Sequence, residues 1–299
     1  MKKLILLSVA SLAFACSKQA VDLTYTADST AEAGQQVGDA MVSVDESGGS
    51  SSGAIAQFDF SADQKTFARL SHNSVRQEPI LLKIIFPEAH AAACSTVAFS
   101  ACSSGQRVRD LNSCTTALNG VMSGNVTLTF SGSGVATCTI PAASDAVSRV
   151  PNYSVTGLRG ATFAVAATST GQTVTRTGAT TFTFANAGIR RSFTTPKGVV
   201  ILDLTTTTAS PITVTGNSRT SRTMTGGGLT ILNNLTGVSC PLVPSSVTWT
   251  AGCNCPTSGS WGGTCSDSTT MNVAFSATCG AATVTKGTET STITMDRCQ

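Results

Sequence analysis

From about residue 95 onward, apolar residues alternate with threonine and other small residues, and the alternation breaks every 8–14 positions. The clearest examples are residues 126–130, 162–167, 181–184 and 292–295. Side chains of a β-strand point alternately to its two faces. The period of two therefore predicts half-buried antiparallel strands with an apolar inner face and a threonine-rich outer face.

Glycine-containing segments separate the alternating stretches, and those at residues 131–134, 170–172 and 226–228 predict turns. Roughly a dozen strands fit between such breaks, which predicts an all-β, antiparallel, sandwich-like fold for residues 94–299. This region forms one domain or two subdomains that divide near residues 197–240. A short β-solenoid, suggested by the regular stretch at residues 198–237, is the alternative fold.

The composition excludes several other classes of protein. Threonine and serine account for 47 and 37 of the 299 residues, and charged residues for only 12%. The glycines have no period of three, so the chain is not collagen, and Glu, Lys and Leu are too few for a coiled coil. No stretch of about 20 apolar residues exists for a membrane-spanning helix. With 41% hydrophobic residues and a net charge of +3, intrinsic disorder is also disfavoured.

The chain contains 11 cysteines, and ten of them fall into two even groups. The first group is Cys94, Cys102, Cys114 and Cys138, and the second is Cys240, Cys253, Cys255, Cys265, Cys279 and Cys298. Even numbers predict two disulfides in the first group and three in the second, formed in an oxidising compartment. Four cysteines allow 3 pairings and six allow 15, so the sequence leaves the connectivity open.

The eleventh cysteine, Cys16, ends a hydrophobic segment at the amino terminus. Lys2 and Lys3 precede residues 4–15, in which only Ser8 and Ser11 are polar, and this charge and length pattern indicates an export signal. The segment Ala13-Phe14-Ala15-Cys16 resembles the lipobox of bacterial lipoproteins, although the resemblance covers only residues 1–17. It implies cleavage before Cys16, attachment of diacylglycerol to its thiol and acylation of the new amino terminus, for example with palmitate. Ser17 in place of Asp implies sorting to the outer membrane.

The segment between the signal and the β region divides into two parts. We expect residues 16–53 to be a lipid-anchored flexible tether, because residues 17–53 have no sustained hydrophobic period and end in a Ser/Gly-rich run. Residues 54–93 should hold a short helix at 61–76, followed by a buried strand at residues 80–86. The segment at residues 17–90 is acidic, with ten acids and five bases, whereas residues 91–299 carry six acids and twelve bases.

Catalytic motifs are missing, so we expect no enzyme activity, no cofactor and no metal. The two histidines, His72 and His90, precede the β region, and no nucleophile elbow, phosphate loop, dinucleotide fingerprint or calcium loop occurs. Cys253 and Cys255 are too closely spaced for a usual zinc pair, which favours disulfides over a thiolate metal site. A secreted hydrolase would have to use acids that are scattered singly, namely Asp110, Asp145, Asp203, Asp267, Glu289 and Asp296. Of these, Asp203 lies within an apolar run, where an outward-facing strand position explains it.

Three arginine pairs and two tryptophans are the remaining candidates for a binding role. The pairs Arg107 with Arg109, Arg190 with Arg191, and Arg219 with Arg222 lack interleaved aromatic residues, so we expect no nucleic-acid binding and interpret them as edge-strand charges that oppose aggregation. Trp249 and Trp261 flank the cysteine loop, where packing against disulfides is the usual role.

The sequence therefore predicts a lipid-anchored cell-envelope protein with a binding, adhesion or surface-structural role. Its partners would be the membrane, through the lipid on Cys16, and a surface polymer or protein contacted by loops, especially residues 253–265. A periplasm-facing structural or assembly lipoprotein and a secreted hydrolase are the two alternatives.

Overall fold

The computed structural model describes residues 29–47, 61–74, 93–116, 119–216 and 218–298. The helices are α1 (Ser29–Ser47) and α2 (Ser61–Ser74), and three short 3₁₀ helices are η3 (Cys94–Thr96), η4 (Val135–Thr137) and η5 (Arg219–Ser221). The strands are β1 (Gln106–Asp110), β2 (Val121–Ser131), β3 (Ala146–Thr156), β4 (Thr162–Ala167), β5 (Gln172–Arg176), β6 (Thr181–Asn186), β7 (Ile189–Thr194), β8 (Val200–Ser210), β9 (Ile212–Thr215), β10 (Thr223–Thr225), β11 (Gly228–Asn233), β12 (Ser239–Trp249), β13 (Pro256–Thr264), β14 (Thr270–Phe275), β15 (Ala281–Lys286) and β16 (Glu289–Thr294). Neither described helix combines the length and the apolar character needed to cross a bilayer.

All sixteen strands belong to one antiparallel sheet, which confirms the all-β prediction. The register shows that four pairs of strands lie in line, because both members of each pair bond to the same neighbouring strand: β4 with β5, β7 with β6, β8 with β9, and β11 with β10. When each in-line pair is counted as one, the chain crosses the sheet twelve times, and each crossing lies beside the one before it. This meander excludes the β-solenoid alternative for residues 198–237, and the sheet continues without a division through residues 197–240.

The breaks between the two members of each in-line pair lie next to one another and form a crease across the sheet. Backbone hydrogen bonds join Thr168 to Gly188 (3.0 Å) and Ala187 to Gly171 (2.8 Å) across this line. A Cβ on Gly171 would lie 2.1 Å from the carbonyl oxygen of Arg149, so the close approach of the next strand requires glycine there. The expected turns at residues 170–172 and 226–228 are therefore wrong. The chain continues in the same direction through both, whereas residues 131–134 do connect β2 to β3.

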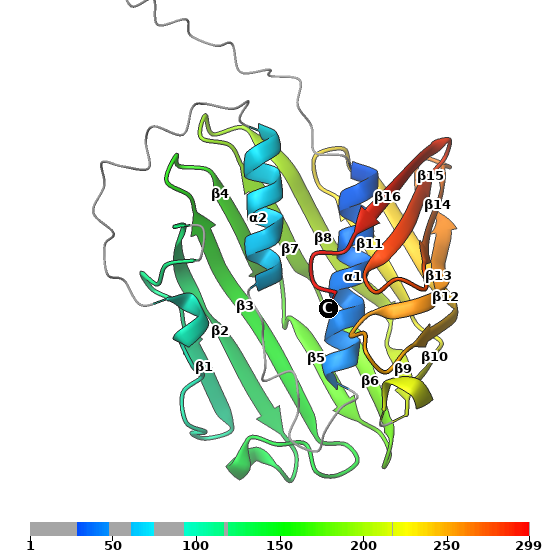
Figure 1. Ribbon diagram of the computed structural model, residues 1–299. Coiled ribbons are helices and arrows are strands. Elements are labelled where there is room, and N and C mark those ends of the chain that lie inside the picture. The colour runs from blue at the N-terminus through cyan, green and yellow to red at the C-terminus, as the bar shows by residue number, and fades with distance from the viewer. Residues whose placement is uncertain (1–28, 48–60, 75–92, 117–118, 217, 299) are drawn as a thin grey trace, which may run out of the picture.

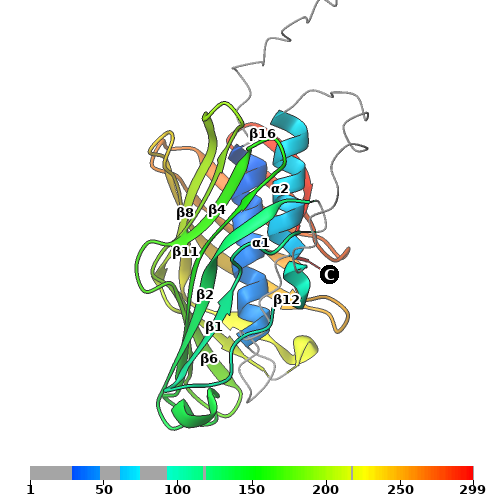
Figure 2. The ribbon, with the colours of Figure 1, turned by 90° about the vertical axis from the view of Figure 1, so that its left-hand side faces the viewer.

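The sheet curves around α1, as Figures 1 and 2 show. One core consists of apolar α1 residues packed against β2, β3, β5, β6, β9 and β11 to β16, and includes Ala33, Val37, Ala40 and Met41. Two glycines let the helix lie close to the last two strands, because an added Cβ at Gly34 would be 2.4 Å from Cγ2 of Val284. The helix is thus enclosed between opposite parts of a single sheet.

The second core lies under α2, on the part of the sheet formed by β2, β3, β4, β7 and β8. Phe67 and Leu70 are buried there, and the ring of Phe67 lies 6.1 Å from that of Phe193. This confirms the helix predicted from residue 61. The strand predicted at residues 80–86 lies outside the described residues.

The prediction of a flexible tether over residues 16–53 is wrong for residues 29–47, which form the buried helix α1. Its apolar residues do have helical spacing, at positions 33, 37, 40 and 41. However, Glu32, Gln35 and Gln36 are buried as well. Polar residues at these positions hid the core helix from an analysis of hydrophobic periodicity. Residues 16–28 and the Ser/Gly-rich run at 48–53 lie outside the described residues.

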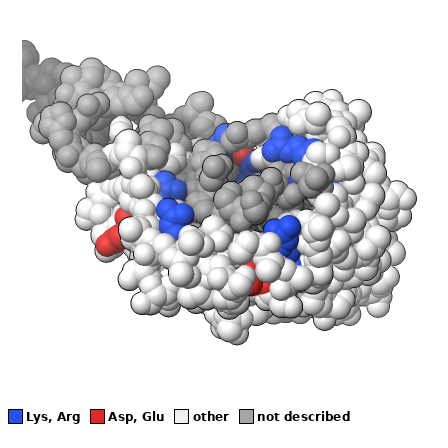
Figure 3. All heavy atoms as spheres, turned by 90° about the horizontal axis from the view of Figure 1, so that it is seen from below, with Lys and Arg blue, Asp and Glu red and all other residues white. Residues whose placement is uncertain are grey.

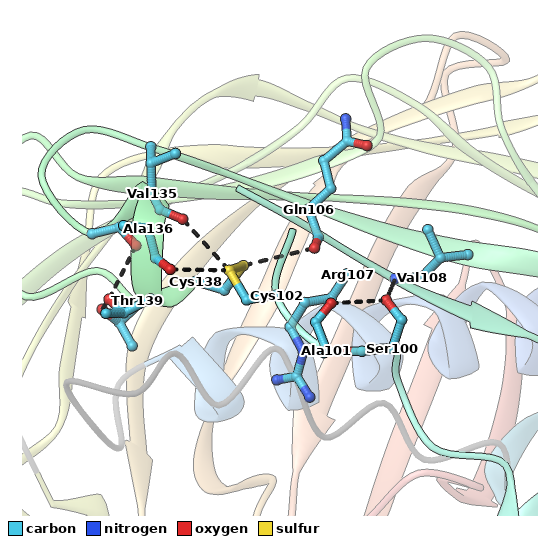
Figure 4. The surroundings of a disulfide bond; sticks show 12 residues. Ser100, Ala101, Cys102, Gln106, Arg107, Val108, Val135, Ala136, Cys138 and Thr139 are labelled. Atoms are coloured by element: carbon cyan, nitrogen blue, oxygen red, sulfur yellow. Dashed lines mark hydrogen bonds between the residues drawn. A yellow bond between two sulfur atoms is a disulfide. The ribbon is translucent and has the colours of Figure 1, made fainter. Parts of the chain in front are cut away.

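Five disulfides form within the two predicted groups and none between them. They are Cys94–Cys114, Cys102–Cys138, Cys240–Cys265, Cys253–Cys279 and Cys255–Cys298. Figure 4 shows the second of these, which joins the segment before β1 to the end of η4. Its sulfurs lie near backbone carbonyls, with Cys102 Sγ 3.5 Å from the oxygen of Val135. Four of the disulfides thus fasten cysteines that lie outside the strands, whereas Cys240–Cys265 joins β12 to the end of β13.

Candidate functional site

A group of buried charged side chains lies where α1, α2 and the carboxyl-terminal segment meet the sheet. Arg191 on β7 and Arg297 after β16 both approach Asp39 of α1, with N–O distances of 3.1 and 3.6 Å. Arg297 also lies 3.3 Å from Asp63 of α2, which accepts a 2.5 Å hydrogen bond from the hydroxyl of Tyr153. We refer to these five residues as the inner ion cluster.

A row of polar residues on α1 extends this cluster along the crease. Gln36 accepts hydrogen bonds from Nη1 of Arg191 (2.8 Å) and from the hydroxyl of Thr206 (3.2 Å). Ser43 accepts one from Nη2 of Arg149 (2.8 Å). Gln36, Asp39 and Ser43 share one face of the helix because they are three and four residues apart. This face of α1 is therefore matched to arginines of the sheet.

A second ionic group joins the two helices to the carboxyl-terminal segment. Arg69 of α2 forms ion pairs with Glu32 of α1 and with Asp296, at 3.2 Å for the second pair. Asp296 also accepts a hydrogen bond from the hydroxyl of Thr66 (2.8 Å), and its backbone N–H donates to Oε1 of Gln35 (2.8 Å). Residues near both ends of the chain thus hold α1 and α2 together.

Burial and neighbouring charges together shift the pKa values of the inner ion cluster and of Arg69. It raises the pKa of Asp39 above its usual value, although the charges of Arg191 and Arg297 oppose this shift. Burial and the nearby Asp63 carboxylate raise the pKa of Tyr153 well above its usual value, so its hydroxyl stays protonated and donates to Asp63. For Arg69, burial lowers the pKa, but the hydrogen bond and charge of Glu32, together with Asp296, raise it overall.

The arrangement is suited to holding elements together, because each of its acids contacts an arginine. Within the part of the chain that the structure describes, no three or more His, Cys, Asp or Glu side chains are grouped so as to hold a metal ion. His72 lies in α2, but its side chain and all of His90 are outside the described residues.

The cysteines of the loop that the sequence singled out are buried, and most of that loop forms strand β13, on which Ser258 and Thr264 are exposed. Cys253 and Cys255 are both in disulfides, so neither supplies a thiolate to a metal. Trp261 is fully buried in the first core and Trp249 is 5% exposed, with the guanidinium of Arg222 5.6 Å from its ring. The two tryptophans therefore lie in the same core as the Cys240–Cys265 disulfide, in keeping with the packing role that the sequence indicated.

The three arginine pairs have different environments. Arg107 and Arg109 lie on β1, whose only partner strand among the described residues is β2, and both guanidinium groups lie about 6 Å or less from the ring of Phe99. The edge-strand interpretation fits this pair. It is wrong for Arg191 and Arg222, which are buried.

The single acids of the β region have separate local partners. Asp267 lies 3.4 Å from Nζ of Lys286, and Asp145 accepts hydrogen bonds from Ser133 and Ala142 in the β2–β3 connection. Asp203 lies on the opposite face of β8 from Leu202 and Leu204, as expected, but it is buried there (5% exposed) and accepts a 2.7 Å hydrogen bond from Nε of Arg190. Asp110 is exposed on β1.

The ion pair at Asp203 gives a prediction for acid stability. The hydrogen bond from Arg190, together with one from Asn234, lowers the pKa of Asp203 below its usual value. A lowered folded-state pKa contributes stability that is present above the unfolded pKa of about 3.9 and is lost as the pH falls below it. We expect Asp203→Asn to lower the unfolding free energy at pH 7 by about 1 kcal/mol. Measured by urea unfolding, the difference in unfolding free energy between this variant and wild type should disappear near pH 2–3. A difference that stays constant from pH 7 to pH 2 would contradict the prediction.

Sequence reasoning missed the inner ion cluster, although one signal points to it. Arg149 and Arg191 occupy positions in phase with the apolar residues of their strands, between Val147 and Pro151 and between Ile189 and Phe193. An arginine on the inward face of a strand requires a buried acceptor or acid. The partner could not be chosen from sequence, because α1 and the carboxyl-terminal segment lie far from these strands in the chain.

Comparison with known proteins adds no relative: no family model, no curated protein and no solved structure matches the chain.

Proposed function

We propose that this protein is a lipid-anchored component of the bacterial cell envelope that acts by binding or as a structural element, without catalysis. The observation that carries the proposal is the pairing of cysteines. Five disulfides use ten of the 11 cysteines and leave Cys16, the residue that ends the signal-like segment. Disulfides favour an oxidising compartment outside the cytoplasm, where a lipid on Cys16 would hold the protein at a membrane.

The outer face of the sheet supports a binding role better than the cysteine loop does. Thr175, Thr183, Thr213 and Thr225 pair across four adjacent strands and form one row. Thr181, Thr215, Thr223 and Thr248 form a second row beside it. Adjacent strands are about 4.8 Å apart, so the rows present regularly spaced hydroxyl groups. We infer that this face contacts a hydroxyl-rich surface polymer or a protein partner.

The hydrolase alternative has less support, because the acids of the β region that it would need have separate local partners. The proposal of a non-enzymatic role predicts that Asp203, Asp267 and Asp296 are dispensable for any activity found.

Replacement of Cys16 tests the anchor. We expect Cys16→Ser to abolish incorporation of labelled palmitate and to move the protein from the membrane fraction to the soluble fraction. Ser17→Ala is the matched control and should keep both the label and the membrane association. The five disulfides should persist in either variant, measured as ten thiols that react only after reduction. An unlabelled wild-type protein, or a labelled Cys16→Ser variant, would refute the anchor.

Protease treatment of intact cells separates the two envelope locations. The resemblance at Ser17 implies sorting to the outer membrane, and we expect digestion of the β region if the protein faces outward from that membrane. Survival until the envelope is broken would favour the periplasm-facing structural or assembly role.

A further inference from the structure

One end of the sheet carries both the start of α1 and a series of turns. The turns at residues 157–161, 195–199 and 234–238 follow β3, β7 and β11 and lie at this end, because Thr162 pairs with Thr194 and Asn233 pairs with Leu204. The hydroxyl of Thr30, in the first turn of α1, donates a 3.1 Å hydrogen bond to Glu289 after the β15–β16 turn. We call this the turn end, which is at the top of Figure 1.

Exposed apolar side chains are concentrated at the turn end. In the described part of the chain, seven large hydrophobic residues are exposed, and five of them lie here: Val121, Leu158, Val199, Val200 and Leu235. Leu158 is 82% exposed, on the tip of the β3–β4 turn. The other two, Val108 and Val243, lie within β1 and β12. Isolated exposed apolar residues are ordinary, whereas their gathering at one end indicates a contact surface.

The order of the strands places these turns in a line. The sequence of neighbours is β3, β4, β7, β8, β11 and β12, so successive turns are two strands apart. That separation corresponds to about 10 Å between the tips that carry Leu158, Val199 and Leu235. A line of protruding apolar tips is suited to a flat apolar–polar boundary better than to a concave pocket.

Basic residues accompany the apolar tips. Arg159 follows Leu158 and Lys197 lies two residues before Val199, and both are exposed. Among the described residues, the acids at this end are Asp267, which pairs with Lys286, Glu289, which binds Thr30, and the buried Glu32 of α1, which pairs with Arg69. Figure 3 views the opposite end, where Lys and Arg side chains also gather. None of the seven exposed large hydrophobic residues is there, so only the turn end combines both features.

The length of the connecting chain keeps this end close to the proposed anchor. Twelve residues, 17–28, separate Cys16 from Ser29 at the start of α1. A fully extended chain of that length spans at most about 40 Å. A lipid on Cys16 would therefore attach at the turn end, whereas the opposite end lies farther from the attachment point by the length of α1, about 28 Å.

We propose that the turn end docks onto the lipid bilayer, with Leu158, Val199 and Leu235 entering the interfacial region and Arg159 and Lys197 near the phosphates. The proposal rests on lipidation of Cys16. The apolar tips gain from leaving water and the basic side chains gain from anionic headgroups. The sheet then stands on the membrane with its threonine rows to the side, available to a partner.

Quenching by brominated phospholipids tests this contact on the lipidated full-length protein in phosphatidylethanolamine–phosphatidylglycerol vesicles. We expect Leu158→Trp to lose the emission of its added tryptophan in brominated vesicles. Val243→Trp, at an exposed position 60% accessible within β12, is the matched control and should keep its emission. Trp249 and Trp261 are buried and give the same background in both variants.

Two readouts separate failure of docking from failure of the anchor. If both variants float with the vesicles but neither is quenched, the docking surface is wrong and the anchor stands. If the mass of the amino-terminal peptide shows no lipid and the protein does not float, the anchor is wrong and docking falls with it. Equal quenching of Leu158→Trp and Val243→Trp would also overturn the proposal, since it would show no preferred orientation.

Discussion

Replacing Arg297 with methionine should lower the free energy of unfolding by about 3–5 kcal/mol. Arg297 is the arginine that lies between Asp39 of α1 and Asp63 of α2, and its own side chain is 4% exposed. Methionine fills much of the same volume but removes the charge. The variant would leave two buried carboxylates with one fewer counter-charge, which costs far more than loss of an exposed pair.

The pH dependence of this loss provides a second check. The pKa of Asp39 is raised by burial even with Arg297 present, and removal of that positive charge should raise it further. A raised folded-state pKa gives stability that is present at low pH and is lost as the pH rises through it. The deficit of Arg297→Met should therefore shrink as the pH falls below that raised pKa, as measured by urea unfolding from pH 8 to pH 4.

Arg190→Met is the matched control for this experiment. The side chain of Arg190 is 52% exposed and pairs with that of Asp203, which is 7% exposed but keeps a hydrogen bond from Asn234, so we expect a smaller loss of about 1–2 kcal/mol. Similar losses in the two variants would show that the inner ion cluster does not contribute as we infer.

Removal of the disulfide Cys255–Cys298 should cost about 2–5 kcal/mol. This bond joins the segment before β13 to the carboxyl terminus across 43 residues. The segment it holds carries Asp296 and Arg297, which bind both helices. With the double change Cys255→Ser and Cys298→Ser, we therefore expect α1 and α2 to lose contacts that the sheet itself retains.

Native-state hydrogen exchange distinguishes this effect from a general loss of stability. Amides of α1 and α2 should exchange at lower free energies than those of β3 and β4 in the double variant. The control removes Cys102–Cys138, which spans 36 residues and joins segments near β1 and η4. It should lower stability without selectively releasing the helices. Equal exchange in the helices of both variants would contradict the proposed clamp.

The strands were predictable because their environment is local in the sequence. Phe182 and Phe184 face inward and Thr181 and Thr183 outward in the structure, as the period of two requires. The grouping of cysteines was predictable for a similar reason, since each disulfide joins residues no more than 43 apart.

Features that depend on distant parts of the chain could not be predicted in this way. The face of α1 that contains Gln36 and Asp39 is polar because its partners are Arg191 and Arg297, which sequence periodicity does not identify. Glycines such as Gly171 produce the same break in the alternation whether the chain reverses or continues. The structure shows that the chain continues at Gly171, because the strands on both sides of it, β4 and β5, pair with β3.

The position of α1 also governs the order in which the protein can fold. Each strand pairs with one that precedes it in the chain, so the sheet can grow as the polypeptide emerges, whether from the ribosome or, under the proposed export, from a translocation channel. The helix emerges first, yet it packs on β15 and β16, which emerge last; its Thr30 binds Glu289, 259 residues later. The core therefore cannot close until β15 and β16 have emerged. A chain anchored at Cys16 would finish folding at the membrane surface, because α1 stays without its β15 and β16 contacts until those strands form.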